Sequence, residues 1–153
     1  MRGRLAFGAL LLALGLASPA HAATCAITEV NAVAFGAYNP FSGASGTATG
    51  WVTYQCSLFA VLDRVSLDLS TGSSGQYAPW RTLMSGTHAL NYNLYLDAAL
   101  TQVWGNGAGS TFRYGPQPLP IFETRVYVYG FIPASQNAWQ GSYTDTITIT
   151  MSF

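Results

Sequence analysis

The chain has 153 residues, of which 50% are hydrophobic and only 8% are charged. This composition excludes a disordered segment, because so much apolar surface needs a packed core. Six basic and six acidic residues cancel, and no run of like charges occurs. Binding to nucleic acid or another polyanion through a basic patch is therefore not expected.

Residues 1–22 carry the three parts of a secretory signal peptide. Two arginines precede an apolar stretch at residues 5–17, and an Ala-x-Ala motif at residues 20–22 marks a cleavage site. The apolar stretch is too short for a transmembrane helix, which needs about 20 residues. We therefore expect cleavage after residue 22, export, and one mature domain at residues 23–153.

The chain has two cysteines, Cys25 and Cys56. An even pair in an exported chain predicts one disulfide. Closing this loop is worth roughly 3.5 kcal/mol in the chain-entropy model. The cysteines offer no ligand spacing for zinc, so we expect neither a metal nor another cofactor.

Alternation of apolar and polar residues predicts β-strands along the mature chain. These fall at residues 25–35, 47–56, 61–70, 89–96 and 124–132. Glu29 and Asn31 interrupt the first, which indicates a bulge. The segment 111–122 is too rich in proline for a central strand. Six or seven strands without a helix predict an antiparallel sandwich of immunoglobulin type.

Residues 143–153 are predicted to form the final strand. Ile147, Ile149, Met151 and Phe153 fall on one face of it, and threonines and a serine fall on the other. At 3.3 Å per residue this strand would span roughly 36 Å. No turn or further strand follows it, so we expect one of its sides to lack a pairing partner within the chain.

Catalysis finds little support in the sequence. The glycine-rich residues 105–109 precede neither a helix pattern nor Lys-Ser/Thr, so we expect a loop rather than a phosphate site. His88 has no nucleophile motif near it and is expected to be a solvated loop residue. Asp145 is expected to bond loop backbone. We therefore predict that the protein is not an enzyme.

Apolar side chains in two predicted loops are candidates for contact with a surface or partner. They are Pro79, Trp80, Leu119, Pro120, Ile121 and Phe122. The alternative is that they fold back onto the core. Likewise Trp51, Trp80, Trp104 and Trp139 could stack on sugars or fill the core. A self-contained secreted module that binds carbohydrate or another surface ligand is therefore an alternative function.

The chain resembles the spore coat protein U domain family, found in subunits of archaic (Csu-type) chaperone–usher pili. The residues that carry the resemblance run through the mature chain in order. They are Cys25, then residues 35–38, 50–56, 81–84, 90–95, 103–105, 129–130, 141–145 and 147–150.

The resemblance implies an incomplete immunoglobulin-like sandwich that lacks its last strand. A periplasmic chaperone would lend a strand to the gap until a neighbouring subunit replaces it at the outer-membrane usher, by β-strand addition. Ile147, Ile149, Met151 and Phe153 would form the receiving edge. The carboxylate of Phe153 would also be anchored by basic chaperone residues.

One feature departs from a polymerising subunit of this family. If cleavage follows residue 22, only Ala23 and Thr24 precede Cys25, and two residues are too few for a donor strand of about five. We therefore expect a subunit that accepts a strand but donates none, at the pilus tip. The implied role is surface adhesion and biofilm formation, with export through the periplasm to the cell surface.

Overall fold

The computed structural model describes residues 23–57 and 63–153. The predicted signal peptide and residues 61–62 of the predicted third strand lie outside them. The described chain forms eight strands and one short 3-10 turn, η1 (Gly72–Ser74). The strands are β1 (Cys25–Asn31), β2 (Gly46–Cys56), β3 (Arg64–Leu69), β4 (Arg81–Ser85), β5 (His88–Tyr95), β6 (Tyr114–Pro118), β7 (Thr124–Ile132) and β8 (Ile149–Ser152).

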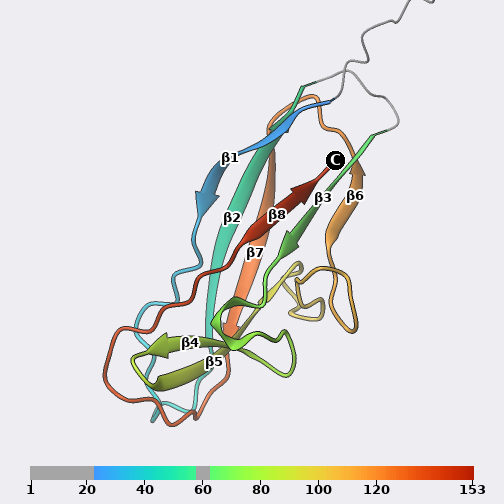
Figure 1. The fold of residues 1–153 in the computed structure, drawn as a ribbon. Coiled ribbons are helices and arrows are strands. Elements are labelled where there is room, and N and C mark those ends of the chain that lie inside the picture. Colours follow the sequence, from blue (N-terminus) through green and yellow to red (C-terminus); the bar gives the residue numbers. More distant parts are fainter. Residues whose placement is uncertain (1–22, 58–62) are drawn as a thin grey trace, which may run out of the picture.

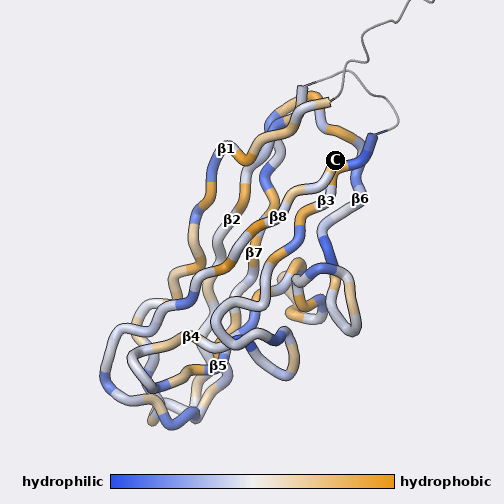
Figure 2. The backbone as a smooth tube through the Cα atoms, viewed as in Figure 1, coloured by the Kyte–Doolittle hydropathy of each residue, from blue (hydrophilic) through white to orange (hydrophobic). Residues whose placement is uncertain are grey.

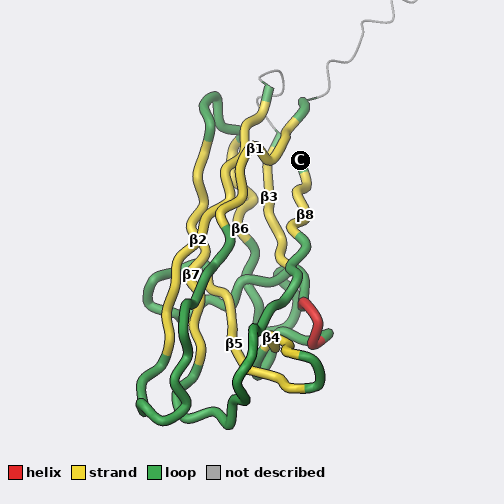
Figure 3. The backbone as a smooth tube through the Cα atoms, turned by 90° about the vertical axis from the view of Figure 1, so that its left-hand side faces the viewer, coloured by secondary structure: helices red, strands yellow, loops and turns green. Residues whose placement is uncertain are grey.

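Two antiparallel sheets pack face to face (Figure 1, Figure 3). One has the order β1-β2-β7-β5-β4 and the other β6-β3-β8. Hydrophobic positions alternate with hydrophilic ones along the strands (Figure 2). On β7, for example, Val126 and Val128 are buried while Tyr127 between them is exposed. The predicted two-sheet antiparallel sandwich is therefore confirmed.

The predicted disulfide is present between Cys25 and Cys56, with an S–S distance of 2.02 Å. The two cysteines lie directly opposite each other in the β1–β2 pair. Beyond them the amide of Ser57 donates to the carbonyl oxygen of Thr24 at 2.7 Å. The bulge predicted in the first strand is also present, just after Ile27.

The prediction of a continuous final strand at residues 143–153 is wrong in its length. Only β8 pairs as a strand, with β3 of the three-stranded sheet. Earlier in the segment, Thr144 forms a bridge to Met84 of β4, in the other sheet. Between these two pairings, the carboxylate of Asp145 accepts a hydrogen bond from the amide of Ser73 in η1.

A buried arginine links both sheets at the level of η1, and the sequence pattern did not reveal it. Arg81 is fully buried and donates to Oδ1 of Asn93 at 2.6 Å, to the carbonyl oxygen of Trp104 at 2.6 Å and to that of Ser70 at 3.0 Å. Burial lowers the pKa of the Arg81 guanidinium. These bonds satisfy a charge that would otherwise be costly to bury.

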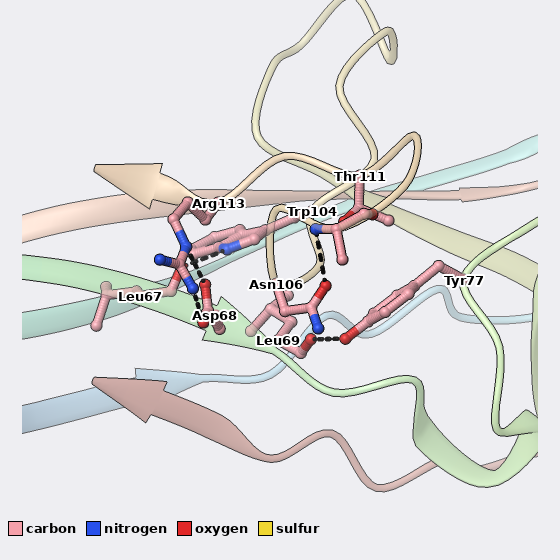
Figure 4. A network of polar contacts seen from close by, with 9 residues as sticks. Leu67, Asp68, Leu69, Tyr77, Trp104, Asn106, Thr111 and Arg113 are labelled. Carbon is pink, nitrogen blue, oxygen red and sulfur yellow. Dashed lines mark hydrogen bonds and ion pairs between the residues drawn. The ribbon is translucent and has the colours of Figure 1, made fainter. Parts of the chain in front are cut away.

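Trp104 and Tyr77 extend this network to β3. The indole of Trp104 donates to the carbonyl oxygen of Leu67 at 3.0 Å, and the hydroxyl of Tyr77 donates to that of Leu69 at 2.8 Å (Figure 4). These two bonds hold the carbonyl groups of Leu67 and Leu69 near the positions where β6 and β8 stop pairing with β3. β3 is the strand on which β8 rests, so the network also supports β8.

Candidate binding groove

One flank of a groove is formed by residues 32–38, which follow β1. This stretch belongs to no strand. It crosses β2 closely at Gly50, where a Cβ atom would meet the main chain of residues 31–33. It then packs over Gly130 of β7, where a Cβ atom would lie 2.5 Å from Val33 Cγ1 and 2.6 Å from Phe35 Cζ. Glycine at these two positions lets the stretch lie close to the core.

The opposite flank is β8 with the residues that lead into it (Figure 1). The amide of Ser70 donates to the carbonyl oxygen of Thr148 at 2.9 Å, so the main chain of Thr148 faces β3. Orientation alternates along an antiparallel strand, so the main-chain groups of Ile149 and Met151 face away from β3. Within the described residues no strand pairs with that side of β8.

Between the flanks lies a cavity of about 190 Å³, called here the narrow chamber. Its floor is made of buried core side chains from both sheets, and its walls include Ile147 and Ile149. The floor residues are Val52, Leu69, Tyr92, Leu94 and Val128. The hydrophobic core is therefore accessible from the groove.

A second cavity of about 720 Å³, the wide chamber, lies between residues 33–41 and 138–145. Leu83, Leu90 and Ile132 are among its lining residues. Val33, Phe35, Leu83 and Asp145 line both chambers. The two chambers together therefore form one continuous groove.

Asp145 stands where the chambers meet. Its carboxylate accepts hydrogen bonds from the amide of Ser73 at 2.8 Å and from the hydroxyl of Tyr92 at 2.6 Å. Burial, together with the bond to Asp145, raises the pKa of Tyr92 far above its ordinary value. Asp145 is the single charged residue among the described residues that line the chambers. The groove therefore suits an uncharged, largely apolar occupant, and Asp145 bonds loop backbone as predicted.

The residues of the predicted receiving edge lie along this groove, with one difference among them. Ile147, Ile149 and Met151 are half-buried and pack against the core. Phe153 follows the end of β8, and 52% of its side chain is exposed. The first strand was predicted to run to residue 35, but β1 ends at Asn31, and residues 32–38 form the facing flank without strand pairing.

The two predicted contact loops lie at opposite ends of the sandwich. Trp80 and Pro79 are near the end of β7, and Trp80 packs against Phe131 with ring centroids 6.1 Å apart. Residues 119–122 lead into the start of β7. The two loops therefore do not form one surface.

Within these loops the side chains divide between core and solvent. Trp80 and Pro120 are half-buried and Leu119 packs against the core, whereas Pro79, Ile121 and Phe122 are exposed. The expected alternative of folding back onto the core therefore holds for part of each loop.

The four tryptophans form no common platform. Trp104 is fully buried, and the guanidinium of Arg125 covers Trp51 at 4.7 Å from the ring centroid. Trp139 is 64% exposed and stacks on His88, with ring centroids 5.0 Å apart. Phe41, which the sequence analysis did not select, is 94% exposed at the same end of the sandwich.

Of the other candidate sites, His88 is exposed as predicted but begins β5 rather than lying in a loop. The glycine-rich residues 105–109 form a turn in which Oδ1 of Asn106 accepts from the amide of Ala108 at 3.0 Å (Figure 4). Among the described residues, no three His, Cys, Asp or Glu side chains gather as they would around a metal ion. Within residues 23–57 and 63–153, no helix has the length and hydrophobicity to cross a membrane.

Comparison with known proteins gives the family. The model of the Spore Coat Protein U domain matches residues 11–150. The chain belongs to this family. Protein U of Myxococcus xanthus is 33% identical over an alignment of 131 residues, and the alignment covers 78% of this chain and 70% of that protein.

A solved structure supports the fold. It is titled as the CsuC–CsuE chaperone–tip adhesion subunit pre-assembly complex from archaic chaperone–usher Csu pili of Acinetobacter baumannii. One of its chains superimposes with a TM-score of 0.59 at 20% identity, over 86% of this chain. This likeness confirms the predicted immunoglobulin-like sandwich. The protein spans about 40% of the length of that chain.

Proposed function

We propose that the protein is a structural and adhesive subunit of an archaic chaperone–usher pilus that accepts a β-strand from another chain. The observation that carries the proposal is the groove. It combines an unpaired main-chain edge on β8 with an apolar floor in the narrow chamber. Main-chain hydrogen bonds would give the incoming strand its affinity, and its alternate side chains would fill the chambers.

A chaperone and a neighbouring subunit would occupy the groove in turn, and the outer-membrane usher would mediate the exchange. An apolar groove beside an open edge favours aggregation unless it is covered. Family membership and the chaperone complex named in the structural neighbour support this proposal. Phe153 directly follows β8, and the proposal has its carboxylate anchored by basic chaperone residues.

The proposal places the signal peptide at residues 1–22, the pilin-like domain at residues 23–153, and the mature protein at the cell surface. Ala23 is buried and the amide of Thr24 donates to Oγ of Ser57 at 3.2 Å. Both residues are thus held in the fold and cannot reach a neighbour. If cleavage follows residue 22, the subunit has no donor strand, which supports a tip position.

Adhesion and biofilm formation form the finer part of the proposal. Phe41 and Trp139 are exposed, and the loops that carry them lie at the end of the sandwich away from the C-terminus (Figure 1). In a tip subunit attached through its groove, this end would be free to meet a surface. Both side chains also line the wide chamber, so the variant Phe41→Ser with Trp139→Ser is first shown to bind a peptide of alternating apolar and polar residues as tightly as wild type. Adhesion of cells that carry this variant, compared with cells that carry wild type at equal pilus number, then tests this part.

The strand-accepting function is tested with the purified mature domain and a peptide of about seven residues that alternates apolar and polar side chains. We expect the peptide to raise the melting temperature, by an amount that grows with the logarithm of the peptide concentration once it exceeds the Kd. A peptide of the same composition in scrambled order is the control. A domain that is stable alone, stays monomeric and ignores both peptides would contradict the proposal.

Two variants locate the binding site of the peptide. Ile149→Asp introduces a charge into the narrow chamber and should abolish the stabilisation by the peptide. Thr150→Asp changes the neighbouring residue, whose side chain is exposed on the outer face. It should leave peptide binding intact. Equal responses of the two variants would show that the peptide binds elsewhere.

A further inference from the structure

We propose that the strand that enters the groove carries a bulky aromatic side chain into the wide chamber, beyond the part of the strand that pairs with β8. This inference rests on the proposed strand-accepting function and names a chemical requirement on the partner. Asp145 lines both chambers and therefore marks the boundary between the narrow chamber beside β8 and the wide chamber.

The position of the wide chamber leads to this inference. The free main-chain edge runs from Met151 back toward Ile147, beside the narrow chamber. The wide chamber is lined by residues 138–145, which precede that edge. A strand that only pairs with β8 would therefore leave the larger cavity unfilled. Because the chambers are continuous, the same chain can extend from one into the other.

The two chambers differ in size. At about 190 Å³ the narrow chamber is comparable with an apolar protein cavity of about 150 Å³ that holds one benzene molecule. It has room for one side chain but not for a large ring together with its main chain. At about 720 Å³ the wide chamber falls in the range of small-molecule pockets, about 300 to 1,000 Å³. It has room for a large ring together with the main chain that carries it.

The lining of the wide chamber favours an aromatic ring over an aliphatic chain. Phe35, Tyr38 and Tyr143 contribute rings, which offer edge-to-face contacts. Gln140 and Ser142 are exposed at its rim and can meet the polar atom of a tyrosine or tryptophan. The carboxylate of Asp145 already accepts hydrogen bonds from Ser73 and Tyr92. Its charge therefore does not require a cationic side chain on the incoming strand.

The test compares three forms of the alternating peptide with the mature domain. The first is the core peptide, and the others extend it by about four residues at one end or the other. Each extension carries either tryptophan or alanine at its apolar positions. We expect tryptophan at one end to tighten binding at least about tenfold over alanine, as measured by calorimetry. The end that shows the gain also reveals the direction of the strand.

Two domain variants test where the ring binds. Ala37→Trp fills the wide chamber from its wall and should remove the gain while leaving the affinity of the core peptide unchanged. Ala99→Trp is the matched control, because Ala99 is exposed and lines neither chamber. A gain that persists in Ala37→Trp would overturn the inference.

The remaining outcomes separate this inference from the proposed function. Binding of the core peptide without any gain from tryptophan overturns the aromatic requirement and leaves strand acceptance standing. Failure of the core peptide to bind overturns both. If N-acetyltryptophan amide, supplied separately, binds the wide chamber as tightly as the tethered ring, the chamber is a small-molecule site and the inference is wrong.

Discussion

Replacing Gly130 by alanine tests how closely residues 32–38 pack onto β7. The backbone of Gly130 has no positive φ angle, so it can accept alanine without strain. With free space, the change would stabilise the fold by about 0.4 to 1 kcal/mol, because alanine restricts the unfolded chain. Instead, the new Cβ atom would meet Val33 Cγ1 at 2.5 Å and Phe35 Cζ at 2.6 Å.

This steric clash determines whether Gly130→Ala stabilises or destabilises the fold. Overpacking in a core costs about 1 to 3 kcal/mol, which exceeds the gain from alanine. Val33 and Phe35 belong to a stretch outside the strands, and the open side available to them is the groove. We therefore expect Gly130→Ala to lower the free energy of unfolding and to weaken binding of the alternating peptide.

Urea unfolding of Gly130→Ala and Gly46→Ala measures the difference. Gly46 is the control because its added Cβ atom would meet Ile132 Cβ at 3.6 Å, an ordinary contact. We expect Gly46→Ala to be as stable as wild type or slightly more stable. Equal stability of the two variants, with unchanged peptide binding, would refute the close packing of this flank.

Three further predictions concern the disulfide, the buried tyrosines and the buried arginine. Cys25→Ser with Cys56→Ser should lower the free energy of unfolding by about 2 to 5 kcal/mol, measured by urea unfolding beside wild type under oxidising conditions. Burial raises the pKa of Tyr54 and Tyr92, so the unfolded chain releases their protons first and stability should fall as the pH rises above about 10. In Tyr92→Phe the fall should be shallower, and an unchanged slope between about pH 8 and pH 11 would contradict this reasoning. Arg81→Met should cost roughly 3 kcal/mol, because it leaves buried carbonyl groups without donors, and thermal unfolding that matches wild type would contradict that role.

Local patterns were sufficient to predict β2, β3, β5, β7 and the disulfide, whereas β4 and β6 were not predicted, because neither segment has a clear alternation and β6 contains two prolines. Alternation at residues 124–132 coincides with β7, because each inward position of that segment faces one core. The final strand was predicted too long for a physical reason. Its apolar face is interrupted at Asp145, whose carboxylate bonds Ser73 and Tyr92, and only residues 149–152 pair with β3.

The groove and the buried arginine depend on contacts that local patterns do not record. Arg81 has a side chain that normally lies at a surface, and its burial requires carbonyl groups from Ser70 and Trp104, which are distant in the chain. Likewise, the groove is formed by stretches at the two ends of the domain. Ile147 and Ile149 indicated one wall through their alternation, whereas residues 32–38 carry no strand pairing that would have indicated the other.

Proline on β6 has a consequence for how many neighbours the domain can hold through strand pairing. β6 is the far edge of the three-stranded sheet, and it contains Pro116 and Pro118 among its five residues. Proline has no amide hydrogen, so this edge offers few donors to another chain. Of the two edges of that sheet, β8 is the one equipped to pair. This sheet therefore offers one edge for strand pairing, so under the proposed function the domain would hold one neighbour through it and would cap the end of an assembly.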